Sequence, residues 1–246
     1  MGILVAGDLL ALWERGWPLH SIDRALAVLA EALPERHADE LADLPLGQRD
    51  ALLLRARGET LGDRIEAQDV CPACGERVEV QLSCQALASS GTPGEAPQGR
   101  WTLEHDGCKV TLRPLDSRDA AAAARCADLE SARATLLGLA IVAARCAGRD
   151  VSADELPTAV IAAAAASVAD NDPGAEIEFR LRCPSCGHAW DDTLDVASFV
   201  WAEIADRAQR VLLDVDALAR AYGWREPDIL ALSEERRAAY LALAGS

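Results

Sequence analysis

Two turns of the same type carry the residues of this chain best suited to chemistry. Each has the pattern Cys-Pro-x-Cys-Gly; the first holds Cys71 and Cys74, and the second holds Cys183 and Cys186. The proline presets the backbone after the first cysteine. The glycine after the second cysteine permits a positive φ, so that backbone N–H groups can turn toward the sulfurs. Each turn therefore offers two thiolate ligands on one side of a tight loop.

A tetrahedral structural zinc ion takes four such ligands. The two turns lie far apart in the sequence, and no cysteine follows Cys186. We therefore expect one zinc ion per chain, and we interpret the long intervening segment as an insertion. Loop-closure entropy grows slowly with length, and zinc binding of about 10 kcal/mol or more can offset it. The expected ligands are Cys71, Cys74, Cys183 and Cys186.

Other chemistries for these thiols stay open. A rubredoxin-like iron could use the same four ligands, and each Cys-x-x-Cys pair could act as a redox pair. His188 could replace a cysteine, or it could be an exposed histidine on the strand that leaves the turn. A closed site of four thiolates leaves no open position for catalysis. The chain also lacks a phosphate-binding loop, a dinucleotide fingerprint and a His-Glu-x-x-His motif, so we expect that it is not an enzyme.

The other four cysteines, Cys84, Cys108, Cys126 and Cys146, lie singly. No secretory signal and no membrane-spanning stretch is apparent, which favours a cytoplasmic protein. In that compartment cysteines are thiols or metal ligands rather than disulfides. Cys126 and Cys146 fall in apolar stretches that we expect to be helical, where both would be core residues.

The charge of the chain bears on its partners. The formal net charge is −16, and Lys109 is the only lysine. A nucleic-acid binder normally presents a basic face, because phosphate contacts supply most of its affinity. We therefore expect neither nucleic acid nor an anionic membrane as a partner, although a zinc-ribbon nucleic-acid binder stays an alternative to be tested by salt-dependent binding.

Helical patterns surround the two turns. Apolar residues recur at helical spacing in residues 21–33 and 41–62, and an apolar stripe runs along one helix from Val200 to Tyr222. Alternating residues predict strands beside the turns, for example residues 177–182.

The segment between the turns has three expected parts. Residues 89–99 form a Gly/Pro/Ser loop, and residues 101–115 predict a hairpin around Asp106-Gly107. Alanine-rich helices are expected from Ser117 to about Ala169.

These elements predict a mainly α fold. Helical N- and C-terminal parts are joined by a small β zinc ribbon that two distant Cys-Pro-x-Cys-Gly turns assemble, with a hairpin plus alanine-rich helical insertion. The expected parts are the N-terminal helical part, 1–66; the split zinc ribbon, 67–84 and 177–195; the insertion, 85–176; and the C-terminal helical part, 196–246.

An ordered set of stretches resembles a known family. It runs from "WERGWPLHSIDRALAVLAEA" through "LPLGQRDALLLRAR" and "CPACGE" to "CPSCGHAW" and "LARAYGWREPDILALSEERRAAYL". The set is similar to the phage baseplate hub assembly chaperones, whose relatives occur beside phage-like contractile injection systems. The resemblance covers about residues 1–85 and 170–243, and the middle of the chain carries no matching motif.

The resemblance implies a non-enzymatic assembly chaperone or adaptor that binds baseplate hub or wedge proteins in the cytoplasm of the producing cell. The alternative is a permanent structural baseplate component, which would also be present in the assembled particle. Exposed aromatic and arginine residues at chain ends often mark partner surfaces. The residues expected to contact partners are Trp13, Trp17, Tyr222, Trp224, Arg225 and Arg237.

Overall fold

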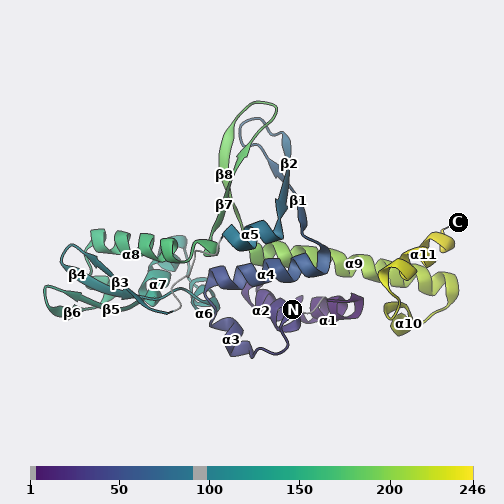
Figure 1. The fold of residues 1–246 in the computed structure, drawn as a ribbon, viewed down its shortest axis with the longest axis horizontal. Helices are drawn as coiled ribbons and strands as arrows, with labels where there is room; N and C mark the ends of the chain where they lie inside the picture. Colours follow the sequence, from purple (N-terminus) through teal and green to yellow (C-terminus); the bar gives the residue numbers. More distant parts are fainter. Residues whose placement is uncertain (1–3, 91–98, 246) are drawn as a thin grey trace.

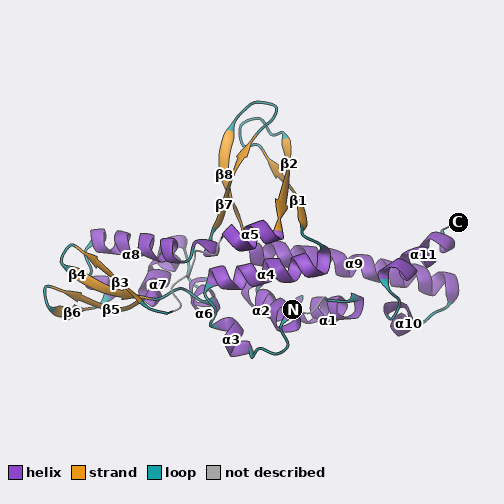
Figure 2. Ribbon diagram, in the orientation of Figure 1, coloured by secondary structure: helices purple, strands orange, loops and turns teal. Residues whose placement is uncertain are grey.

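The computed structural model describes residues 4–90 and 99–245 (Figure 1). Helices form most of the described chain, and strands occur in two separate hairpins and one small sheet (Figure 2). The predicted mainly α fold is therefore confirmed. Within the described residues, no helix combines the length and the apolar character that a membrane span requires.

A central helical bundle is built from the two ends of the chain. The largest buried cluster joins Leu12, Leu29 and Leu53 from the N-terminal helices to Val200 and Ile204 from a long C-terminal helix. Apolar side chains at helical spacing turn one face of each helix toward this core. The helices of the bundle are α1 (Ala6–Gly16), α2 (Ser21–Ala32), α3 (Ala38–Ala42), α4 (Leu46–Leu61) and α9 (Val196–Tyr222).

Both ends of α9 follow from local chemistry. Asp195 caps its first turn by accepting a hydrogen bond from the Ser198 backbone N–H. Gly223 ends it in the left-handed conformation, with φ of 68°. The predicted stripe is confirmed, since Val200 and Leu218 are buried along it, although Tyr222 at its end is exposed.

Two antiparallel hairpins rise side by side from the bundle and approach each other at their tips (Figure 1). The first follows α4 directly, and the second leads into α9. Their strands are β1 (Arg64–Val70) with β2 (Arg77–Ser83), and β7 (Ile177–Arg182) with β8 (Ala189–Leu194). The short helix α5 (Cys84–Ser90) follows β2. The strands predicted beside the cysteine turns are therefore present.

The segment between the hairpins forms a lobe with its own core, at the left of Figure 1. A four-stranded antiparallel sheet in the order β3-β4-β5-β6 packs against α8 through Val110, Ala144, Val160 and Ala164. The strands are β3 (Trp101–His105), β4 (Cys108–Leu112), β5 (Ile141–Cys146) and β6 (Arg149–Val151). The helices are α6 (Ser117–Ala123), α7 (Leu129–Ala140), η1 (Ala153–Glu155), α8 (Thr158–Asn171) and η2 (Pro173–Ala175).

The hairpin predicted around Asp106-Gly107 is confirmed. Both residues have positive φ, of 46° and 71°, which matches the twist of a two-residue hairpin turn. Of the Gly/Pro/Ser loop expected at residues 89–99, residues 91–98 lie outside the described residues.

The alanine-rich helices expected from Ser117 to about Ala169 are interrupted by strands over residues 141–151, so the expectation is wrong there. There β5 and β6 form a second hairpin around Ala147 and Gly148. The alanines suggested helix, but Ile141 and Val142 are β-branched and the following glycine permits a tight turn with φ of 82°.

The expectations for three lone cysteines also need correction. Cys146 lies on β5 rather than in a helix, directly opposite Cys108 on β4, and the two form a disulfide instead of staying thiols. Cys126 lies in the connection between α6 and α7 and is only half-buried. Sequence spacing could not reveal the pairing, because it depends on the register of two strands that are not consecutive hairpin partners.

The C-terminal helices pack against the far half of α9 (Figure 1). They are α10 (Glu226–Leu230) and α11 (Glu234–Ala244). An ion pair joins the buried Arg237 of α11 to the half-buried Asp214 of α9, with Nε 3.0 Å from Oδ2. The end of the chain is therefore fixed to the long helix.

Candidate metal centre

Four sulfur atoms meet where the two hairpin tips converge. The Sγ atoms of Cys71, Cys74, Cys183 and Cys186 all lie within 4.8 Å of one another. Across the two hairpins, Cys71 Sγ lies 3.7 Å from Cys186 Sγ, and Cys74 Sγ lies 3.6 Å from Cys183 Sγ. The structure thus brings together all four residues expected from the sequence to bind metal.

The first turn is held by its own backbone. The Cys71 N–H donates to the Glu76 carbonyl at 2.9 Å, and the Gly75 N–H donates to the Cys71 carbonyl at 2.9 Å. Gly75 has φ of 74°, a conformation that glycine adopts without strain.

The second turn has the same two backbone hydrogen bonds at equivalent positions. The Cys183 N–H donates to the His188 carbonyl at 2.8 Å, and the Gly187 N–H donates to the Cys183 carbonyl at 3.0 Å. Gly187 has φ of 75°. Two equivalent turns therefore face each other, each with one buried and one exposed cysteine.

The spacing of the sulfurs fits a tetrahedral metal ion. A metal–sulfur distance of about 2.3 Å in a regular tetrahedron places the sulfurs about 3.8 Å apart. The two distances between opposite hairpins, 3.7 and 3.6 Å, are close to that value. The four cysteines can therefore hold one metal ion in a closed site.

Backbone hydrogen bonds and neighbouring sulfurs shift the pKa values of Cys183 and Cys74 in opposite directions. Backbone N–H donation from Cys186 lowers the pKa of Cys183 to about 7. The backbone N–H of Glu76 also acts to lower the pKa of Cys74, but the Cys186 thiol and burial outweigh it and raise that pKa to about 12. A positive charge among the sulfurs, such as a bound metal ion, would be needed to make Cys74 a thiolate near neutral pH.

A hydrogen bond between the hairpins supports the site. The Trp190 indole Nε1–H on β8 donates to Asp69 Oδ2 on β1 at 2.9 Å. The Trp190 side chain also packs against the small cluster formed by Cys71, Val78 and Cys183. Sequence analysis did not identify this support; the only sign was an aromatic residue shortly after the second turn.

His188 is not part of the group of ligand atoms. It is exposed, and its ring stacks on that of Trp190 with 6.1 Å between centroids. Its exposure agrees with the alternative of an exposed histidine.

The residues expected to bind partners lie in two aromatic groups. Near the start of the chain, Trp17 is 59% exposed and its ring lies 5.6 Å from that of the half-buried Trp13. Arg24 fixes the turn that carries Trp17, because its guanidinium donates to the Gly16 and Trp17 carbonyls and lies 5.0 Å from the Trp201 ring centroid. Trp17 is therefore an exposed ring on a well-supported turn.

The second aromatic group lies at the end of α9. Tyr222 stacks on Trp224 at 4.8 Å, and Tyr240 of α11 meets both rings edge-on. Arg225 is exposed at the start of α10, whereas Arg237 is only 3% exposed and is engaged by Asp214. Tyr240 could not be predicted from the sequence, because its place beside the other two rings depends on how α11 folds back.

Comparisons with known proteins identify the family of the chain. No curated protein and no solved structure matches it. The family model described as T4 bacteriophage base plate protein matches residues 20–143, from the bundle helix α2 through the first cysteine turn to β5. Because the match covers just over half of the chain, the protein belongs to the T4 bacteriophage base plate protein family.

Proposed function

We propose that the protein is a non-enzymatic assembly chaperone or adaptor for the baseplate of a phage tail or phage-like contractile injection system. The observation that carries the proposal is the match to a baseplate protein family. Membership of that family suggests other baseplate proteins as partners. The proposal specifies hub or wedge proteins, bound in the cytoplasm of the producing cell, and it assigns no catalytic step.

The proposed role of the cysteine site is structural. Closed sites of four thiolates are the usual structural zinc sites, and the sulfur spacing described above suits that ion. The first hairpin continues from α4 and the second continues into α9, so a zinc ion at their tips would tie the N-terminal and C-terminal parts of the fold together. Zinc rather than iron is part of the proposal and is checked by elemental analysis.

The proposed contact surfaces are the two aromatic groups. An exposed tryptophan on a fixed turn loses little conformational entropy when it is buried by a partner, and such residues often dominate binding energy. Trp17 meets that description best, and Tyr222 and Trp224 form the second surface. Arg225 is exposed beside the second surface.

The test is a native purification of the tagged chain from producing cells, with partners identified by mass spectrometry and compared with the protein inventory of purified finished particles. Hub or wedge proteins in the purification, with this chain absent from particles, are the expected result. The chain at fixed stoichiometry in particles would instead support a permanent structural component, which the family match supports equally well. Absence of every baseplate protein from the purification would overturn the proposal.

A matched pair of variants sharpens this test. Trp17→Ala removes the exposed ring at the start of the chain, and the expected result is loss of one or more baseplate partners. Leu139→Ala removes an exposed apolar side chain from α7 in the insertion and serves as the control. Equal recovery of partners by both variants would contradict a contact role for Trp17.

A further inference from the structure

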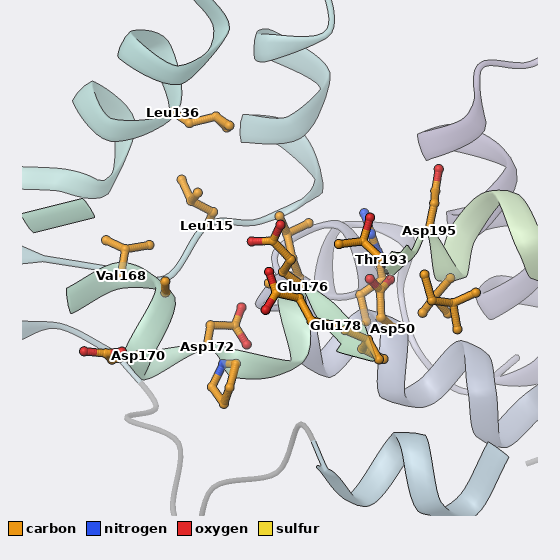
Figure 3. A pocket seen from close by; sticks show the side chains of 18 of the residues that line it. Asp50, Leu115, Leu136, Val168, Asp170, Asp172, Glu176, Glu178, Thr193 and Asp195 are labelled. Carbon is orange, nitrogen blue, oxygen red and sulfur yellow. Dashed lines mark hydrogen bonds and ion pairs between the residues drawn. The ribbon is translucent and has the colours of Figure 1, made fainter. Parts of the chain in front are cut away.

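A groove of about 830 Å³ lies where the insertion meets the helical bundle (Figure 3). The start of α4 and the strands β7 and β8 line it on one side. Helices α7 and α8 and the segment η2, all from the insertion, line the other side. The groove is therefore made by segments that are far apart in the sequence and come together only in the fold.

The lining combines apolar walls with carboxylates. Apolar side chains come from both sides, for example Leu46 of α4 and Leu136 of α7. Between these walls, Figure 3 shows the side chains of four acidic residues gathered in one region. They are Asp50, Asp172, Glu176 and Glu178.

The negative charge of the groove is not balanced within the described residues. Arg49 is the only basic residue in the lining, and its Nε already contacts Asp50 Oδ1 at 2.7 Å. The described part of the chain provides no ion pair for Asp172, Glu176 or Glu178. The carboxylates of the groove thus exceed the cations available to them.

Asp172 is the most informative of these carboxylates. It is only 8% exposed, and it accepts a hydrogen bond at 3.1 Å from the neutral backbone N–H of Gly47. Arg49 acts on Asp172 only from a distance, because its ion pair is with Asp50, and a nearly buried carboxylate without a direct ion pair is costly. Burial raises the pKa of Asp172, and burial also raises the pKa of Asp50 despite its contact with Arg49.

A single metal ion does not account for the arrangement. Among the described residues, the only group of three or more ligand side chains close enough for one ion is the four-cysteine cluster. The groove carboxylates are spread over a larger space, which suits a larger cation with an apolar portion. Arginine and lysine side chains have that character, since both carry an aliphatic stem below the charge.

We propose that this groove docks a segment of a neighbouring baseplate protein that inserts arginine or lysine side chains between the apolar walls. Such a segment is complementary in charge to the unbalanced carboxylates of this preformed groove. The inference rests on the proposed function, because it takes the occupant from another baseplate protein. It adds a contact surface distinct from the two aromatic groups.

The test measures binding between the full chain and a purified baseplate protein recovered with it. The groove variant is Glu176→Gln with Glu178→Gln, and the control variant is Glu35→Gln with Glu79→Gln, which removes the same charge at exposed positions elsewhere. The expected result is a loss of affinity of roughly tenfold or more for the groove variant and less than about twofold for the control. Equal affinities of the two variants would overturn the inference.

A second experiment identifies the occupant by replacing Thr193, which lines the groove and is exposed, with a photoreactive amino acid that cross-links to the bound segment. The expected cross-link falls on a partner segment that contains arginine or lysine. A cross-linked segment without basic residues would overturn the inference while leaving the proposed function intact. If no baseplate protein bound even the parent chain, the proposed function itself would fail and the inference with it.

Discussion

At the scale of single residues, the joint between the insertion and the bundle depends on Gly47. A Cβ atom at this position would lie 2.2 Å from Asp172 Oδ1 and 2.8 Å from the backbone carbon of Gly174. The Gly47 N–H also donates to the Asp172 carboxylate across this contact. The second residue of α4 therefore has to be a glycine for η2 to pack against the helix start.

Gly47→Ala is expected to destabilise the protein by about 1–3 kcal/mol, because backbone and a buried carboxylate would have to move. The measurement is the free energy of unfolding in urea. The control is Gly138→Ala in α7, where a Cβ meets no atom within 4 Å. That control is expected to leave stability unchanged or to raise it by about 0.5–1 kcal/mol. A Gly47→Ala protein as stable as the control would contradict the close contact.

Asp172→Asn is expected to change how stability depends on pH. Because the pKa of Asp172 is higher in the folded chain than the ordinary value, the folded state binds more protons between those two values. The contribution of this carboxylate therefore favours the folded state increasingly as pH falls through the raised pKa toward about 3.9. The asparagine variant lacks that contribution but can still accept from Gly47.

The measurement for Asp172 is the difference in unfolding free energy between parent and variant across this pH range. The parent is expected to gain relative to the variant as the pH falls. A difference that stayed constant, or that moved in favour of the variant, would show that the pKa of this carboxylate is not raised by folding.

Residue-scale features were predictable from the sequence only where their chemistry is local. Each pair of cysteines and its glycine stand within one turn, so type and spacing were enough to identify four ligands. The contact between Gly47 and Asp172 joins residues 125 positions apart, and nothing in either local sequence specifies the other. The pairing of Cys108 with Cys146 was missed for the same reason.

At the scale of secondary-structure elements, a nearly buried arginine joins α4 to α9. Arg57 donates to both oxygens of Glu203, with Nε 2.7 Å from Oε2 and Nη2 2.6 Å from Oε1. The same guanidinium donates to the carbonyls of Gly62 and Arg64, where the chain leaves α4 for β1. One side chain thus positions both the long helix and the base of the first hairpin.

Arg57→Ala is expected to cost about 3–5 kcal/mol, because it leaves a carboxylate and two carbonyls without their donor. Arg64→Ala is the matched control, since Arg64 pairs with Glu66 in an exposed ion pair worth about 1 kcal/mol or less. Denaturant unfolding of both variants measures the difference. Similar small losses for the two would show that the α4–α9 connection does not depend on Arg57.

Element prediction succeeded where periodicity was strong. The stripe from Val200 onward defined α9 because a long helix repeats its buried face many times. It failed for β5, which has only six residues and stands among alanines that favour helix. There the pairing with β4 decides the conformation, and a pattern read over a few neighbouring residues cannot reveal a strand partner that lies far away in the sequence.

At the scale of the whole molecule, the four-cysteine site joins the tips of two hairpins, whose bases both contribute to the core of the bundle through Ile65 and Ile177. Each hairpin is its own two-stranded sheet, and the tips share a small buried cluster and the hydrogen bond from Trp190 to Asp69. Isolated two-stranded hairpins are marginally stable in water. Metal binding at the tips would therefore supply much of the stability of this part of the fold.

Cys183→Ser is expected to reduce zinc from about one ion per chain to almost none and to lower the melting temperature by about 5 °C or more. Elemental analysis and thermal unfolding measure the two effects. Cys126→Ser changes a half-buried cysteine outside the site and is expected to keep the metal. Chelation of the parent should reproduce the melting behaviour of Cys183→Ser. Retained zinc with an unchanged melting curve in Cys183→Ser would contradict a structural metal site.

The sequence could predict that the two cysteine turns meet, because one tetrahedral metal ion needs four thiolate ligands and each turn supplies only two. It could not predict the groove beside the insertion. The groove lining comes from both sides of the junction between two lobes. Its acidic residues look like ordinary solvated carboxylates until the fold places Asp172 and Asp50 in buried surroundings.

The most direct test of a role in baseplate assembly is removal of the gene from the producing cell, followed by electron microscopy of the particles. The expected result is tails or injection particles that lack complete baseplates, with recovery when the parent chain is supplied again. Normal particles with complete baseplates in the absence of the chain would contradict it.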